Sequence, residues 1–490
     1  MSMFKWKLHG DGKTIEPGGS VAPGERLNWG RTVGLGVQHV VAMFGGTFVF
    51  PIVMGLNPQL AVMMSGVGTV LFLLVVNGKV PSYVGTSAAF VGGVTAVTAQ
   101  GGTPAEVTGA IMVSGVILAL VGAVIHYIGA SVVMKLLPPV ITGGVVMLIG
   151  FNLAPVVAST YWPQDQWIAI IVMVFVVFVS VWVRGFLGRI AVFLGLVFGY
   201  ALSWVFDRVF GQITSFSATA GEVTTHFRVD FSGVEAASWI GFPPLTDTAA
   251  GIVGVHLPVF NAAAIIVMLP GIIALVAENI GHVKAVEEVT GERLDRFMGR
   301  AVIGDAVATV AATAIGGSPT TTHAENIGVM AATKVYSTAA YWVASLTAIL
   351  FGLSPKFGAL IAAVPGGVLG GITVVLYGMI GLLGAKIWIE NRVDFSNPLN
   401  VVPVAAGLVI AIGNVSVNFT DDFVVSGIAL GTILMLAMYH LARWLAPASM
   451  RSAATDAREI SRSVMIGEDD NKRRLTPDDT QELNNERIVD

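Results

Sequence analysis

The sequence predicts an all-α polytopic membrane protein, on three observations. Of the 490 residues, 54% are hydrophobic and only 12% are charged, whereas about 25% charged residues are usual in a soluble protein. Apolar runs long enough to cross a bilayer, roughly 17–25 residues each, recur between residues 31 and 445. The 58 glycines and 21 prolines are tolerated in membrane helices and permit breaks in them.

Fourteen transmembrane segments follow from the alternation of apolar runs and polar breaks. The third and tenth segments, 83–99 and 319–335, look least like simple helices because Gly, Ser and Thr interrupt them. The fourteen segments are expected to begin near residues 33, 58, 83, 104, 138, 166, 188, 261, 298, 319, 338, 357, 398 and 423.

The chain divides into two tails and one membrane domain. Residues 1–30 lack the apolar stretch of a cleavable signal and are interpreted as a cytoplasmic tail. The membrane domain covers 31–445, as repeats over about 31–211 and 260–445 that flank a long external loop over about 212–259. Thr, Ser and Val alternate in that loop, which is compatible with a hairpin. Residues 446–490 mix acidic and basic side chains without apolar periodicity, as in a disordered cytoplasmic tail.

The basic residues of the short loops predict the orientation. The external loops QGGTPAEVT, STYWPQDQW and NVSVNFTDDF contain no Lys or Arg, and Lys356 is the only basic residue in another. Since cytoplasmic loops are enriched in Lys and Arg, both termini are predicted to be inside. The loops assigned to the cytoplasm contain Lys79, Lys135, Arg184, Arg189, Lys284, Arg293, Arg296, Arg300, Lys334, Lys386 and Arg392.

Two stretches half a chain apart resemble each other. TSAAFVGGV (86–94) aligns with TTHAENIGV (321–329) at an offset of 235 residues. These stretches lie in the third and tenth segments, and a shift of seven segments is odd, so the second half is inverted in the membrane. Inverted repeats with interrupted segments indicate a secondary transporter whose site lies where the broken segments meet near the midplane.

The eighth segment carries an acid and an imidazole on one face. Glu278 and His282 are four residues apart after an apolar run, the spacing that aligns side chains on a helix. An ionisable residue at membrane depth costs about 2.5–3.5 kcal/mol on insertion scales, so it faces a cavity or a partner. The alternative is that Glu278 is an ordinary charge at the cytoplasmic end of the helix.

The tenth segment carries a second acid, Glu325, two residues after His323. Thr320–Thr322 favour extended backbone, which is tolerated at membrane depth where it lines a cavity. Such a break before a half-helix leaves main-chain groups free for a planar polar ligand, with Glu325 as acceptor or, when protonated, donor. The alternative is a polar residue at a re-entrant turn.

Two buried acids suit a proton-coupled carrier. Burial disfavours the charged carboxylate and a ligand N–H favours it, so proton binding and ligand binding are linked. His282 is suited to relay protons or to hold Glu278 in position. We therefore expect the proton as coupling ion and no cofactor.

Other polar residues are weaker candidates. Gln38 and His39 either support Glu278 or pack in the core, and Asp305 is either a network member or a charge at the mouth. The remaining histidines form no metal-like cluster, and ENIGH lacks the H-E-x-x-H pair, so neither a metal site nor an enzyme is expected. The absence of cysteine excludes thiolate sites, and the net charge of −4 argues against nucleic acid as a partner.

The motifs resemble those of the nucleobase–ascorbate transporters, also called the nucleobase:cation symporter-2 family. The family signature is matched by Glu325, Asn326, Gly328, Thr333 and Lys334. QH and AMFGGT in the first segment, PSYVGTSAAF in the third and AENIGH in the eighth are also similar. Glu rather than Gln at the first signature position looks like the uracil and pyrimidine permease branch.

The resemblance implies a fold and a partner. Fourteen spans form two inverted seven-span repeats, arranged as a core and a gate domain, with short strands in spans three and ten. Alternating access, proton symport of a nucleobase and a homodimer through the gate domains are implied as well.

The resemblance also implies site roles. Glu278 matches the acid that hydrogen-bonds the base and responds to protonation, and His282 matches its coupling partner. Glu325 matches the second acid that contacts the base. Ala88 and Ala324 occupy strand positions whose main chain meets the ligand.

Three further positions belong to the implied site. Tyr377 matches an aromatic residue of the gate near the ligand, and Asn326 has a supporting role. The uracil transporters of the family commonly have Tyr where this chain has His323, and some have Phe in place of Ala88. His323 therefore either alters substrate choice or adds a titratable group.

The sequence thus predicts a proton-coupled uracil permease of a bacterial inner membrane. Its expected partners are uracil, the lipid bilayer and a second copy of the chain. A purine or xanthine carrier of the same family, an anion exchanger of the same fold and a non-transporting receptor remain alternatives.

Overall fold

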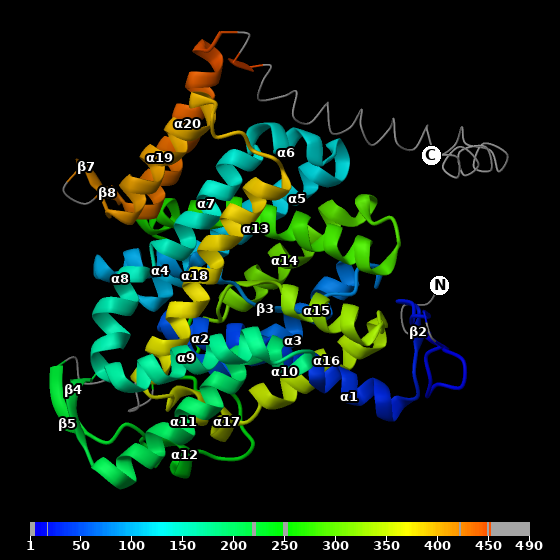
Figure 1. Ribbon diagram of the computed structural model, residues 1–490, viewed down its shortest axis with the longest axis vertical. Helices are drawn as coiled ribbons and strands as arrows, with labels where there is room; N and C mark the ends of the chain where they lie inside the picture. Colours follow the sequence, from blue (N-terminus) through cyan, green and yellow to red (C-terminus); the bar gives the residue numbers. More distant parts are fainter. Residues whose placement is uncertain are drawn as a thin grey trace, which may run out of the picture.

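The computed structural model describes residues 5–16, 18–217, 222–247, 253–420, 423–447 and 450–451. Nearly all of the 446–490 tail lies outside these residues. The described chain is mostly helical, and its helices pack around a short pair of strands at the centre (Figure 1).

The first half of the chain contains two broken segments, at α1–α2 and at β3–α4. Its elements are α1 (Trp29–Ala42), α2 (Phe44–Val53), α3 (Pro58–Val75), β3 (Val84–Thr86), the 3-10 turn η1 (Ala88–Phe90), α4 (Val91–Ala99), α5 (Pro104–Ile128), α6 (Ala130–Leu136), α7 (Pro139–Phe151), α8 (Ala154–Val156), the π turn η2 (Val157–Tyr161), the 3-10 turn η3 (Trp162–Gln164), α9 (Gln166–Trp182), α10 (Phe186–Arg189) and α11 (Ala191–Phe210).

The second half repeats the strand followed by a short helix. Its elements are α13 (Ala262–Thr290), the 3-10 turn η4 (Asp295–Phe297), α14 (Met298–Thr313), β6 (Thr320–Thr322), α15 (Ala324–Thr333), α16 (Thr338–Gly352), α17 (Pro355–Ala362), α18 (Gly366–Glu390), α19 (Pro398–Ile412) and α20 (Gly427–Leu445).

Local sequence explains where several helices begin. The side chains of Asn57, Thr103, Asp165, Asn261 and Asn397 each accept a hydrogen bond from a first-turn N–H, of α3, α5, α9, α13 and α19 respectively. Proline follows the cap in α3, α5 and α19, where its missing N–H costs nothing.

Eight helices in the described residues are long and apolar enough to cross a membrane, or nine if the bent pair α16–α17 is one span. The other expected segments are shorter or broken, so the count of fourteen stays a prediction. One segment was expected to begin near residue 357, but a bend of 81° separates α16 from α17, and the long helix α18 begins only at Gly366.

The helices pack in pairs that recur after a shift of seven segments. In one group, α3 contacts α16 as α14 contacts α5, and α1 contacts α16 as α13 contacts α5. In the other group, α9 contacts α18 as α19 contacts α7, and α11 contacts α9 as α20 contacts α19. We call α1–α5 with α13–α16 the core and α7, α9, α11, α18, α19 and α20 the gate. This pattern is the one that an inverted repeat produces.

The two strands at the centre are antiparallel neighbours although more than 230 residues separate them. Gly85 pairs with Thr321, Val84 with Thr322 and Thr86 with Thr320. The strands begin at 84 and 320, and the helices that follow begin at 88 and 324, so structurally equivalent residues are 236 apart. The sequence offset of 235 was therefore wrong by one residue, because the residues that pair at the centre, Gly85 and Thr321, are themselves equivalent.

Matching hydrogen bonds hold the two ends of this sheet. Ser87 N–H donates to the Pro319 carbonyl at 2.9 Å, and His323 N–H donates to the Tyr83 carbonyl at 3.1 Å. Both pairs obey the spacing of 236 residues.

The outer elements lie on opposite sides of the helices. The hairpin of β4 (Ile213–Ser217) and β5 (Glu222–His226) precedes the short helix α12 (Ser232–Ala236), and β7 (Ser416–Thr420) pairs with β8 (Phe423–Ser426). Both hairpins lie on the left in Figure 1, whereas the N-terminal segment with β1 (Lys7–Leu8) and β2 (Glu25–Arg26) lies on the right. This separation agrees with the sides that the loop charges predict, although the assignment of one side to the cytoplasm stays a prediction.

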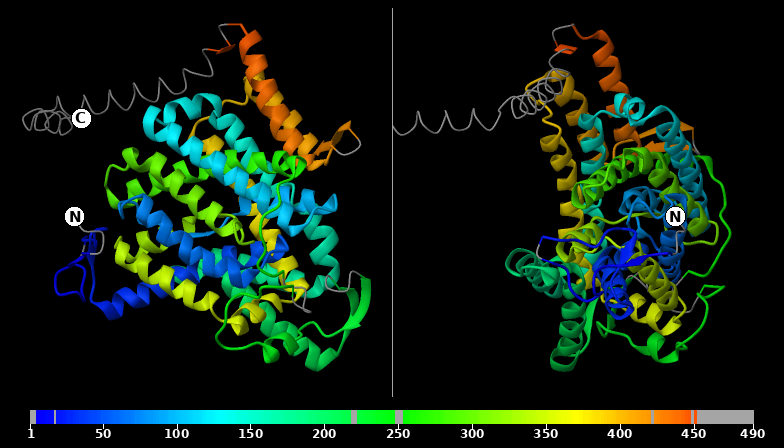
Figure 2. Two further views of the ribbon diagram at one scale, coloured as in Figure 1. Left: turned by 180° about the vertical axis from the view of Figure 1, so that it is seen from behind. Right: turned by 90° about the vertical axis from the view of Figure 1, so that its right-hand side faces the viewer.

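The N-terminal segment docks on the link between α15 and α16. Val21 N–H donates to the Lys334 carbonyl at 2.9 Å, and Tyr336 N–H donates to the Val21 carbonyl at 2.8 Å. Trp6 Nε1 donates to Thr338 Oγ1 at 2.8 Å. Figure 2 shows this segment at the edge of the helices. The segment is therefore attached to the core and is not a free tail.

Candidate functional site

The site is built where both strands give way to short helices. β3 leads through Ser87 into η1, which begins at Ala88, and β6 leads through His323 into α15, which begins at Ala324. Ser87 caps its turn through its hydroxyl, whereas the His323 side chain forms no cap hydrogen bond with α15. Since the strands are antiparallel, the two helices leave the sheet from opposite ends with their positive N-termini towards it.

The outer edge of β6 is saturated by α14. Thr322 N–H donates to Asp305 Oδ2 at 3.0 Å, and Thr321 Oγ1 donates to the same oxygen at 3.4 Å. Asp305 is fully buried. Edge groups at membrane depth have no water to bind, so this carboxylate supplies the acceptor that the strand needs.

Asp305 is thus a network member and not a charge at the mouth. The sequence reasoning left it out of the proposed site, although a signal was present. It is the only carboxylate in the helix that follows Met298, and an ionisable residue in an apolar span is a functional hypothesis by default.

The α13 face carries the predicted acid and imidazole to the same strand. His282 Nδ1 lies 2.8 Å from Thr322 Oγ1, within hydrogen-bond distance. Glu278, one turn earlier, is partly buried and lies within electrostatic reach of His323, Asp305 and Glu325. The predicted helical face therefore points at the crossing of the strands.

Asn279, beside Glu278, was also missed. Its amide is fully buried, and Nδ2 donates to the Leu275 carbonyl at 3.0 Å while Oδ1 has no hydrogen-bond partner among the described residues. An unpaired buried acceptor is uncommon in proteins.

His323 occupies a space that two glycines create. A Cβ on Gly85 would lie 2.6 Å from His323 Nε2, and a Cβ on Gly46 would lie 3.0 Å from His323 Cε1. The imidazole is therefore held between β3 and α2. Its Nδ1 lies 3.3 Å from Glu325 Oε2. The Glu325 side chain is 47% exposed, against 8% for His323, so Glu325 is the acid of this group that is open to an entering molecule.

Asn326 joins α15 to α1. Its Nδ2 donates to the His39 carbonyl at 2.8 Å and lies 3.1 Å from His39 Nδ1, and both side chains are buried. The His39 ring packs on Tyr341, with centroids 4.4 Å apart. Gln38 is partly buried, and the structure, which describes both residues, shows no hydrogen bond between Gln38 and Glu278. His39 therefore supports α15 and not Glu278.

Tyr377 comes from the gate helix α18. It is buried in one hydrophobic cluster with Phe50, Ala89 and Phe90, and Ala88 packs against this cluster. The Tyr377 hydroxyl has no hydrogen-bond partner among the described residues. The gate thus contributes an aromatic side chain beside η1.

The assembled groups suit a small planar polar ligand. Carboxylates accept N–H groups, and uncapped main-chain N–H groups at a helix start donate to carbonyl oxygens. Within the described residues there is no group of three or more His, Asp or Glu placed to hold a metal ion. Binding through hydrogen bonds is the chemistry that these residues offer.

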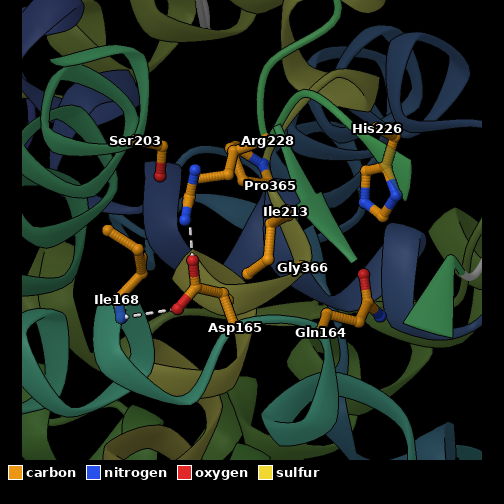
Figure 3. A pocket seen from close by; sticks show the side chains of 10 residues that line it. Gln164, Asp165, Ile168, Ser203, Ile213, His226, Arg228, Pro365 and Gly366 are labelled. Carbon is orange, nitrogen blue, oxygen red and sulfur yellow. Dashed lines mark hydrogen bonds and ion pairs between the residues drawn. The ribbon is translucent and has the colours of Figure 1, made fainter. Parts of the chain in front are cut away.

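A second polar cluster lies outside the crossing and has a structural role. Arg228, after the β4–β5 hairpin, donates from Nε to Asp165 Oδ2 at 2.7 Å and from Nη1 to Asp207 Oδ1 at 3.1 Å (Figure 3). All three side chains are nearly buried. Asp165 also caps α9, so the arginine ties the external loop to α9 and α11 of the gate.

The fold, the broken segments and the acid-lined crossing define a membrane permease. The chain belongs to the nucleobase–ascorbate transporter family: the model described as "Permease family" (Xan_ur_permease) matches residues 30–420. The resemblance based on motifs is thereby confirmed, and the chain is a transporter and not an enzyme.

Two relatives illustrate the similarity. RutG of Escherichia coli (strain K12), whose name describes a pyrimidine permease, is 42% identical over 451 residues, which cover 89% of this chain and 96% of that protein. The uracil permease of Bacillus caldolyticus is 34% identical over 424 residues, which cover 84% of this chain and 91% of that protein.

Solved structures share the fold. The transmembrane domain of the cyanobacterial bicarbonate transporter BicA has a TM-score of 0.52 at 15% identity, covering 84% of this chain and 96% of that one. The murine Slc26a9 anion transporter in its inward-facing state has a TM-score of 0.58 at 11% identity, covering 84% and 68%. At such identities the likeness concerns the fold alone.

Proposed function

We propose that this protein imports uracil together with protons across a bacterial inner membrane. Family membership and relatives whose names describe uracil and pyrimidine permeases support the choice of substrate class. The observation that carries the proposal is that Glu278, His282, His323 and Glu325 gather around the β3–β6 crossing.

Uracil has the complementary chemistry. It is planar, with ring N–H donors and two carbonyl acceptors. Glu278 and Glu325 accept the N–H groups, while main-chain N–H groups near Ala88 and Ala324 donate to the carbonyls. The ring packs beside Tyr377.

Proton coupling follows from the use of a carboxyl as a ligand group. In the proposed cycle, protonated Glu278 faces outward, uracil binds between α13, α15 and the strands, and the core moves against the gate. Loss of the proton inside then weakens uracil binding. His282, held by Thr322, positions Glu278 or relays the proton.

Transport into vesicles tests the coupling. Purified protein in proteoliposomes should accumulate radiolabelled uracil only with an inward proton gradient, and Glu278→Gln should reduce accumulation at least tenfold. Glu390→Gln, on an exposed Glu paired with Lys386 at the end of α18, is the matched control and should transport normally. Equal accumulation with and without the gradient contradicts symport, and full activity of Glu278→Gln contradicts the site.

Competition separates the remaining substrates. Unlabelled uracil should displace the label at both pH 6 and pH 8, whereas excess xanthine should not. Displacement by xanthine would favour a purine carrier, and displacement by bicarbonate or chloride would favour an anion exchanger. Binding without accumulation would indicate a receptor.

A dimer through the gate is part of the proposal. The chain has no cysteine, so one introduced thiol is unique. Val409→Cys, at a 71% exposed position of α19, should form crosslinked dimers in membranes, whereas Leu120→Cys, at a 62% exposed position of the core helix α5, should not. Crosslinking at Leu120 but at no exposed position of the gate contradicts the arrangement.

A further inference from the structure

A second polar pocket lies at the end of the core where the basic loops were expected. It has a volume of about 390 Å³ and opens to the surface. We call it the basic pocket; its lining residues are Asn77, Lys79, His126, Arg296, Phe297 and Arg300.

The ends of three core helices form this pocket. After α3 the chain turns through Asn77 and Gly78, both in the left-handed region with φ of 53° and 60°. The start of α14 crosses the end of α5 so closely that a Cβ on Gly299 would overlap the backbone of His126. The two backbones can meet there only because residue 299 has no side chain, and the pocket forms beside this crossing.

The cations of the pocket lack acidic partners. Within the described residues, neither Lys79, Arg296 nor Arg300 forms an ion pair with a carboxylate. The neighbouring Asp295 is bound by Lys284 at 2.5 Å. Uncompensated positive charge at one place attracts an anion.

Local structure adds to the positive potential. Arg300 lies in the first turn of α14, where the helix dipole is already positive. With the Asn77 amide oriented so that Nδ2 donates to Leu74, its Oδ1 accepts from Arg300 Nη1 at 3.0 Å, which fixes the guanidinium. Arg296 lies over the Phe297 ring at 4.9 Å. The pocket therefore combines fixed cations with an apolar wall.

The surface beside the pocket is apolar. Leu120, Tyr127 and Ile128 of α5 are 62%, 83% and 64% exposed, as expected for side chains that face lipid. The Tyr127 ring lies 4.9 Å from the ring of His126, which lines the pocket. An aromatic residue at the end of a span is typical of the membrane interface.

We propose that the basic pocket binds the phosphate headgroup of an anionic phospholipid. Basic pockets between membrane helices on the cytoplasmic side are suited to such headgroups. The acyl chains would lie along the exposed face of α5, which a free phosphate ion would not use. A bound lipid would hold together the ends of α3, α5 and α14, and so stabilise the core that contains the crossing.

Native mass spectrometry of the purified full chain tests the assignment. The protein is titrated with phosphatidylglycerol or with phosphatidylcholine of the same acyl chains, and a third arm contains sodium phosphate alone. Wild type should bind phosphatidylglycerol about tenfold more tightly, since two or more cations contact the headgroup. Arg296→Gln/Arg300→Gln should lose this preference, and phosphatidylglycerol should no longer raise its melting temperature.

A charge-matched control removes the effect of net charge. Arg293→Gln/Lys386→Gln loses two exposed cations outside the pocket and should bind both lipids as wild type does. Equal losses in the two double variants, or a retained preference in Arg296→Gln/Arg300→Gln, overturn the proposal. Stabilisation by millimolar phosphate without any preference between lipids identifies a free-anion site and also overturns it. Melting temperatures without lipid show that each variant is folded.

Discussion

Thr309 holds the peptide of Thr320 at both of its polar groups. Its hydroxyl donates to the Thr320 carbonyl at 3.0 Å and accepts from the Thr320 N–H at 3.1 Å. In the other half of the chain, the Thr69 hydroxyl holds Val84 in the same manner, at 3.3 Å and 3.0 Å. Each strand of the crossing is thus secured by a threonine of its own repeat, on the edge that has no strand neighbour.

Replacing either threonine by valine should destabilise the protein by a similar amount. Thr69→Val and Thr309→Val each leave a buried strand N–H without an acceptor, which costs about 1–3 kcal/mol. Thr373→Val is the matched control, because this buried hydroxyl only adds a second bond to the Leu369 helix carbonyl. Thermal unfolding in detergent measures the difference. A control as unstable as the strand variants would remove the special role of these two bonds.

The fit of His323 against α2 should appear as energetic coupling. Gly46→Ala places a methyl group 3.0 Å from His323 Cε1, so it should lower stability while His323 is present. In a His323→Ala background the same change should be nearly neutral. A double-mutant cycle on melting temperature should give a coupling of about 0.5–3 kcal/mol, as for residues in contact. Additive effects would show that the imidazole does not fill this space.

Arg228→Met should detach the external loop from the gate. The change leaves Asp165 and Asp207 nearly buried without their cation, and breaking a buried pair from one side costs about 3–5 kcal/mol. Amide hydrogen exchange in β4–β5 should become faster. Arg208→Gln, at an exposed arginine of α11, should leave exchange unchanged. Unchanged protection in Arg228→Met would show that the hairpin is held by other contacts.

The docking of the N-terminal segment should weaken in acid. Partial burial alone would raise the pKa of Glu25, but hydrogen bonds from His9 and from the Ala22 N–H outweigh it and lower the pKa below its usual value. A lowered pKa means that the stabilisation is present above the unfolded pKa of about 4.3 and is lost as the pH falls through the folded pKa.

Limited proteolysis near Lys13 measures this contribution. Wild type should be cut more slowly than Glu25→Gln at pH 7, and the two proteins should converge below about pH 4, where the wild-type carboxyl is protonated. An equal cutting rate at pH 7 would contradict a role for the carboxylate.

Single cysteines should report the orientation. Val223→Cys on the β4–β5 hairpin and Leu8→Cys in the N-terminal segment are both exposed positions, at 66% and 50%. In intact cells an impermeant maleimide should label Val223→Cys and should label Leu8→Cys only after lysis. The reverse pattern would invert the predicted topology.

Local sequence determined much of this protein. Apolar runs gave the membrane domain, because hydropathy within some twenty residues decides insertion. The signature from Glu325 to Lys334 identified the family, which its family model confirms. The four-residue spacing of Glu278 and His282 predicted a shared face, because the helical period is itself local.

Tertiary structure alone decided how these pieces meet. The pairing of Gly85 with Thr321 joins residues 236 apart, and only that pairing corrected the repeat offset. The acceptor role of Asp305 and the contact of His39 with Asn326 likewise depend on which helices cross the strands. Hydropathy and spacing carry no information about such partners, because edge hydrogen bonds and close backbone approaches exist only once distant segments have packed together.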